Sequence, residues 1–257
     1  MAIKILVLIV LDIILILGNS FGERLNYCIS CHRAHYLSYS RCEFCHRGIS
    51  KTKRKQIAHY RLIPGDYAYF RLKESDFFKK GCMLVSKLGC RRCHMILAKG
   101  NNLATSLDQL PKNIEVKELT KNLTSPPEFM PYFSLTNYQI KCIINVIFNG
   151  IFECNRSDEN FWVIHFDSSS NVNEFVKYCG SCHKVISKRY GPLGKGCVGP
   201  NLSGLFLNFF YSERGGWNQD KLIQWIKNPK TIDKSSLMPP ISISDNSVSD
   251  IIKILSN

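Results

Sequence analysis

The chain has 257 residues, of which 45% are hydrophobic and 21% are charged, a composition that allows two or three small folded domains and excludes a disordered chain. Its formal net charge of +14 would suit nucleic acid, but no aromatic-rich basic stripe or base-reading motif accompanies the charge, so we expect no nucleic-acid partner. Its twelve cysteines would usually indicate disulfides in an exported protein, yet most of them follow a stricter spacing.

Residues 1–20 have the form of a secretory signal. One lysine precedes an apolar stretch from Ile5 to Leu17, which is interrupted by Asp12 and followed by small residues. The stretch is shorter than the roughly 20 apolar residues that comfortably span a bilayer. We therefore expect export, or an anchor in the cytoplasmic membrane if this segment is not cleaved.

Four copies of Cys-x-x-Cys-His follow, at 28–32, 42–46, 90–94 and 179–183. This pattern is the attachment signature of c-type haem, because the two thiols form thioethers with the porphyrin and the histidine then lies beneath the iron. A zinc site or a thioredoxin-like redox pair would need no histidine after the second cysteine in all four copies. The sequence predicts four covalent haems c, attached through Cys28, Cys31, Cys42, Cys45, Cys90, Cys93, Cys179 and Cys182, with His32, His46, His94 and His183 as proximal ligands.

Two further histidines are candidate sixth ligands for the first two haems. His35 is too close to His32 to cross the same ring, so we expect it at the second haem, which leaves His59 for the first. The reverse pairing stays open, as does a surface position for either histidine.

Two methionines in proline-flanked turns, Met130 and Met238, are the candidate sixth ligands of the third and fourth haems. Met95 adjoins a proximal histidine and Met83 suits a helix core, so we exclude both as ligands. His165 is expected to be structural, with displacement of Met130 at the third haem as its alternative.

The order of elements suggests three folded parts after the signal. Residues 21–75 hold two haem motifs, little core and a basic run, which is either a solvated face or a docking patch for an acidic partner. Residues 76–165 and 166–257 look like two copies of one helical unit, each with an entry helix, a haem motif, a ligand-bearing turn and a closing helix.

The last copy contains two residues that we expect beside its haem. The carbonyl of Pro200 is placed to accept the Nδ1 hydrogen of His183, which would fix the ring. Asn101 stands where Pro200 would be in the middle copy. Trp225 either faces the haem edge or packs in the core.

Four cysteines lie outside the motifs: Cys82, Cys142, Cys154 and Cys197. One or two disulfides among them would suit an exported protein. Cys142 and Cys154 flank the expected end of one helix and form the most plausible pair.

Residues 166–257 resemble class I cytochromes c through "CGSCH", "GPNLSGLF", "WIKNP" and "LMPP", and residues 76–155 resemble the same family less closely. The whole chain resembles multihaem, here tetrahaem, cytochromes c of bacterial periplasmic electron transfer. The stretch from "CEFCHRG" through "AHYRLIPG" to "GCRRCH" is similar to stretches of cytochromes that belong to selenite/tellurite or metal reduction systems. The resemblance implies a mainly α fold, with a short dihaem segment organised by its haems and two small helical cytochrome c-like domains after it.

The expected function is therefore that of an exported tetrahaem cytochrome that carries electrons between redox proteins, with two bis-histidine and two histidine/methionine haems. Its partners would present an acidic docking face, and it would meet a membrane only through an uncleaved residue 1–20 segment. The alternative is a haem reductase that acts on an oxyanion, nitrite or peroxide at one iron with an open position.

Overall fold

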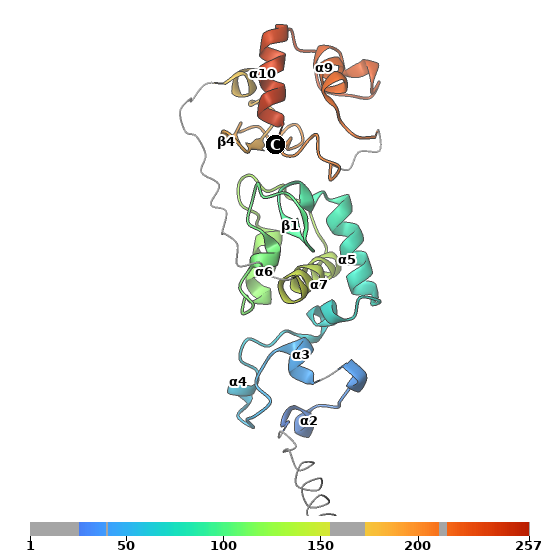
Figure 1. Ribbon diagram of the computed structural model, residues 1–257, viewed down its shortest axis with the longest axis vertical. Helices are drawn as coiled ribbons and strands as arrows, with labels where there is room; N and C mark the ends of the chain where they lie inside the picture. The colour runs from blue at the N-terminus through green and yellow to red at the C-terminus, as the bar shows by residue number, and fades with distance from the viewer. Residues whose placement is uncertain (1–25, 40, 155–172, 211–214, 257) are drawn as a thin grey trace, which may run out of the picture. The chain divides into compact units, whose positions relative to one another are not determined.

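The computed structural model describes residues 26–39, 41–154, 173–210 and 215–256 (Figure 1). The chain is mainly α, as predicted, with two short two-stranded sheets among the described residues. Contacts divide it into two units, Met1–Ile63 and Pro64–Asn257. The signal segment 1–20 and His165 lie outside the described residues. Within the described ranges, no helix is both long and apolar enough to cross a bilayer.

The first unit consists of short helices around the first two motifs. The structure has α2 (Cys28–Cys31), the 3₁₀ helix η1 (Leu37–Tyr39), α3 (Cys42–His46) and α4 (Lys55–Ala58). Helices this short are not stable by themselves in water. Large side chains such as Ile29 and Tyr60 are 56% and 58% exposed, so the unit buries little apolar surface of its own.

The second unit begins with a helical part built around α7 (Asn137–Glu153). Its other elements are η2 (Gly65–Tyr67), η3 (Tyr69–Arg71), α5 (Asp76–Lys87), η4 (Cys90–Arg92), β1 (Met95–Ile96), β2 (Lys99–Gly100), η5 (Leu107–Gln109) and α6 (Val116–Thr124). Helix α7 begins with a capping box between Thr136 and Gln139, and its residues from Cys142 to Ile151 are all buried. It packs against α5 at Gly81, where any side chain would clash with the backbone carbonyl of Cys142 (Figure 1).

Two buried asparagines of α7 attach the segment that precedes α5. The side-chain amide of Asn145 donates to the carbonyl of Asp66 at 2.8 Å, and that of Asn149 donates to the carbonyl of Phe70 at 2.7 Å. Residues 64–75 therefore belong with α7, and the boundary lies after Ile63 rather than after residue 75 as the sequence suggested.

The rest of the second unit repeats the same order of elements. It contains α8 (Glu174–Tyr178), the hairpin β3 (Val185–Ser187) and β4 (Gly191–Leu193), α9 (Gln219–Lys227), η6 (Pro229–Thr231) and α10 (Asp245–Leu255). Helix α8 packs against α10, and the core of this part includes Phe175, Leu205, Leu222, Ile251 and Leu255. In both parts an entry helix leads into the Cys-x-x-Cys-His motif, and a two-stranded hairpin, a middle helix and a closing helix follow. The boundary expected near residue 165 falls outside the described residues, and contacts place both parts in one unit.

The disulfide expected between Cys142 and Cys154 is wrong. Helix α7 runs past Cys142 and ends only at Glu153, so the two cysteines lie at different heights on one helix. Twelve residues of helix span about 18 Å, whereas a disulfide needs Cα atoms within about 7 Å. All twelve cysteines lie in the described ranges, and none of them forms a disulfide there.

Candidate haem-binding sites

Two pairs of histidine rings lie close together in the first unit, with interplanar angles of 51° and 66°. The ring centroids of His32 and His59 lie 5.7 Å apart, and those of His35 and His46 also lie 5.7 Å apart. A metal–imidazole bond is about 2.0 to 2.1 Å long, so two rings on opposite sides of one metal have centroids about 6 Å apart. The structure thus brings together the same two pairs that the sequence favoured: His59 with the first motif and His35 with the second.

Three of the four motif histidines are held by a backbone carbonyl. The Nδ1–H group of His46 donates to the carbonyl of Ile63 at 3.0 Å. That of His94 donates to the carbonyl of Thr105 at 2.7 Å, and that of His183 to the carbonyl of Pro200 at 2.8 Å. Because a carbonyl oxygen can only accept, the proton must lie on Nδ1. Each ring therefore presents the lone pair of Nε2, as a metal-ligating histidine does.

Sequence reasoning found one of these three acceptors. Pro200 was expected, but in the middle copy the acceptor is Thr105, while Asn101 donates its own backbone N–H to Arg91 at 3.0 Å. Ile63 was missed. It follows His46 by 17 positions, the same separation that joins Pro200 to His183, and this repeated spacing was the available signal.

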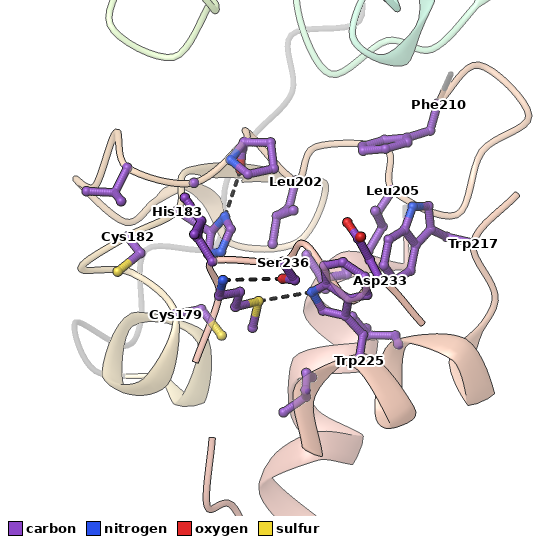
Figure 2. Close-up of a pocket in the computed structure, with 18 of the residues that line it drawn as sticks. Cys179, Cys182, His183, Leu202, Leu205, Phe210, Trp217, Trp225, Asp233 and Ser236 are labelled. Carbon is purple, nitrogen blue, oxygen red and sulfur yellow. Dashed lines mark hydrogen bonds between the residues drawn. The ribbon is translucent and has the colours of Figure 1, made fainter. Parts of the chain in front are cut away.

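The fourth motif opens into a cavity of about 890 Å³. Cys179, Cys182 and His183 line it together with Met238, and most of the other lining side chains are apolar (Figure 2). The volume falls within the roughly 300 to 1,000 Å³ of typical cofactor pockets. Gly199 lies so close to His183 that a Cβ atom there would overlap the imidazole ring, so only glycine leaves the ring in place.

The sixth-ligand candidate of this cavity is held on two sides. The indole Nε1 of Trp225, on α9, donates to the sulfur of Met238 at 3.0 Å, and the backbone N–H of Met238 donates to the hydroxyl of Ser236 at 3.3 Å (Figure 2). Trp225 thus lines the cavity, and its ring packs edge-on against that of Trp217. Met238 and His183 are the two side chains of this wall whose atoms are suited to bind iron axially.

Burial sets the protonation of the motif residues. It raises the pKa of the Cys90 thiol to about 11 and that of the Cys179 thiol to about 11, and it also raises the pKa of Cys93. These thiols are protonated at neutral pH, in contrast to the low-pKa cysteine of a thioredoxin-like pair. Burial also lowers the pKa of His94, which favours the neutral, ligating form of the ring.

Met130 is half-buried in the turn after Pro127, whose carbonyl accepts its backbone N–H at 2.9 Å. Among the interactions of the described residues, none pairs Met130 with His94, so its role at the third haem stays a prediction. His165, the alternative there, is not described. Within the described ranges, no three His, Cys, Asp or Glu side chains gather as a site for a metal ion.

These features fit haem, which supplies four of its iron's ligands itself and needs only two from the protein. Comparison of the chain with known protein families, curated proteins and solved structures finds no match.

Proposed function

We propose that the protein is an exported tetrahaem c-type cytochrome that transfers electrons between redox partners, with two bis-histidine and two histidine/methionine haems. The observation that carries the proposal is the pairing of ligands around the motifs. The ring of His32 lies beside that of His59, the ring of His46 lies beside that of His35, and the fourth motif shares its cavity with Met238. A chance set of Cys-x-x-Cys-His motifs would not need a second candidate ligand near three of the four motif histidines.

The protein's part in this function is to attach the haems, to orient their axial ligands and to shield the haems from water. The motif cysteines would form the thioethers, and the carbonyls that accept from Nδ1 would keep the proximal rings turned with Nε2 toward the iron. The apolar walls of the fourth cavity would exclude water. When bound, each haem supplies one-electron exchange between Fe(III) and Fe(II).

The repeated order of elements in the second unit supports two cytochrome c-like domains there. In each, the motif sits between an entry helix and a hairpin, and a closing helix packs against the entry helix: α7 against α5, and α10 against α8. The first unit, with its paired histidines and small core, supports a dihaem segment organised by its cofactors.

The ligands also imply a direction of electron flow. A methionine ligand raises haem potential relative to a second histidine, so the first two haems should have lower potentials than the last two. Electrons would then pass from the dihaem segment to the histidine/methionine haems. Four indistinguishable potentials in a redox titration, or the reverse order, would contradict this direction.

Location and partners follow from the same proposal. The haems would be attached in the periplasm after export by residues 1–20, with a membrane anchor if that segment is retained. A chain with a formal charge of +14 would dock to redox proteins that present an acidic face.

The direct test is the mass and spectrum of the protein purified from a host that attaches haem c. We expect the mass of the polypeptide plus four haems and a Soret absorbance. The paired variant Cys179→Ser with Cys182→Ser should lose one haem and keep three. A wild-type mass equal to that of the bare polypeptide would overturn the proposal.

A haem reductase remains the second candidate because of the third motif. The first two motifs each have a second histidine ring close to their own, whereas Met130 and His94 are not paired among the described interactions. An open position would therefore arise at the third haem. A high-spin ferric signal that Cys90→Ser with Cys93→Ser removes, together with tight cyanide binding, would favour the reductase over the carrier.

A further inference from the structure

Arg92 belongs to the third haem motif but lines the cavity of the fourth. It stands between Cys90 and Cys93, and together with Gly89 it forms part of the wall that surrounds His183 and Met238. The third motif therefore reaches directly into the space where the fourth cofactor would bind.

The guanidinium of Arg92 is fixed by neutral groups. Its Nε–H donates to the carbonyl of Ser203 at 2.8 Å, and Nη2 donates to the carbonyl of Asn201. The central carbon of the guanidinium, Cζ, lies 4.2 Å from the centroid of the Phe210 ring, so the guanidinium also makes a cation–π contact. These contacts hold the charge in place, but none of them neutralises it.

Among the described residues, no carboxylate pairs with Arg92. Asp233 lines the same cavity, but its Oδ1 accepts from the backbone N–H of Ser235 at 3.0 Å and from its hydroxyl at 2.6 Å. A half-buried guanidinium without an anion is unfavourable. Arginine has five N–H donors, and the two carbonyls leave others available.

We propose that Arg92 binds a propionate carboxylate of the haem held by Cys179, Cys182 and His183, so that the third motif supplies the counter-charge of the fourth haem. The proposal rests on the proposed function, because it needs that haem. Arginine is suited to the role, since its planar fork matches a carboxylate with two parallel hydrogen bonds.

Asn201 links the same wall to the turn that carries Met130, the ligand candidate of the third motif. Its carbonyl accepts from Arg92, and its side-chain amide donates to the carbonyl of Phe129, next to Met130, at 2.9 Å. Asn201 also follows Pro200, the acceptor for His183. The third and fourth haems would therefore behave as an electrically coupled pair with Arg92 between them.

The test compares Arg92→Gln with Arg91→Gln in the holoprotein. Arg91 is the adjacent arginine of the same motif; its Nε–H donates to the carbonyl of Ile96 at 3.2 Å, and it does not line the cavity. A positive charge favours the reduced haem. We therefore expect Arg92→Gln to lower the equilibrium constant for reduction of the fourth haem about tenfold, which is ~59 mV in potential for one electron. Arg91→Gln should lower it much less, and Arg92→Lys should retain most of the wild-type potential.

The fourth haem is identified in these titrations as the one whose potential drops in Met238→His, and mass spectrometry counts haems in every variant. Equal shifts in the Arg91 and Arg92 variants, no shift in Arg92→Gln, or loss of the haem in both Arg92 variants would overturn the proposal. Loss of the haem in Arg92→Gln alone would support it. Failure of the proposed function would look different, since the wild type itself would then carry no haem.

Discussion

The indole nitrogen of Trp225 donates a hydrogen bond to the sulfur of Met238 at 3.0 Å. A thioether is a weak acceptor, so this bond uses one lone pair of the sulfur and leaves the other for a metal. Because α9 carries the tryptophan, the helix fixes both the position of the methionine and the electron density on its sulfur.

We predict that Trp225→Phe lowers the potential of the fourth haem. The variant keeps an aromatic ring but removes the donor that draws electron density from the sulfur. A hydrogen bond of about 0.5 to 1.5 kcal/mol corresponds to roughly a twofold to tenfold change in the reduction equilibrium. An optical redox titration measures it. Trp217→Phe is the control, because Trp217 lines the same cavity and packs against Trp225 at a centroid distance of 5.3 Å. A shift in the control as large as that in Trp225→Phe would show that ring packing is responsible.

Met238→His should convert one histidine/methionine haem into a bis-histidine haem. We expect loss of that haem's sulfur-to-iron charge-transfer band, and a drop in potential that is a substantial part of the ~0.8 V over which axial ligands act. Met130→His should do the same at the third haem. Met83→His is the control, since Met83 lies exposed on α5 and not in the core, where the sequence analysis placed it. If Met130→His leaves every potential unchanged, Met130 is not a ligand.

The histidine pairs predict which haem loses its sixth ligand when His35 or His59 is replaced. His59→Ala should make the first haem high-spin, and His35→Ala the second, because each loses the ring opposite its motif. In a background of Cys28→Ser with Cys31→Ser, which lacks the first haem, His35→Ala should still produce a high-spin signal in electron paramagnetic resonance. His59→Ala should produce none there. The opposite result would establish the reversed pairing.

Gly81→Ala should destabilise the second unit. The added methyl group would meet the Cys142 carbonyl where α5 and α7 pack, and overpacking of this kind costs about 1 to 3 kcal/mol. Thermal unfolding of the holoprotein should show a lower midpoint. Lys80→Ala, at an exposed position of the same helix, is the matched control and should leave the midpoint nearly unchanged. Equal midpoints for Gly81→Ala and wild type would mean that the helices can separate at no cost.

The Cys-x-x-Cys-His motifs can be recognised in the sequence because their residues are consecutive, and haem attachment there stays a prediction. Five consecutive residues hold both thiols and the histidine, so spacing alone identifies them. The pairing of His35 and His59 also followed from spacing, since His35 lies too near His32 to cross a haem. The mainly α fold followed from helical patterns around the later motifs.

The errors arose where contacts are distant or involve the main chain. Every residue has a carbonyl, so nothing in the side chain of Thr105 marks it as the acceptor for His94. The boundary after Ile63 depends on Asn145 and Asn149, which lie in an otherwise apolar helix and bond to carbonyls 79 positions earlier. The disulfide prediction failed because α7 continues through Cys142 to Glu153 and so separates the two cysteines along its axis.

The carbonyls that hold His46, His94 and His183 belong to the main chain, and this affects how the sites can change. Replacing the side chain of Ile63, Thr105 or Pro200 does not delete the acceptor oxygen. Substitutions at these three positions are therefore compatible with an unchanged orientation of the histidine rings. A one-residue insertion or deletion between a histidine and its acceptor, in contrast, would misalign the ring.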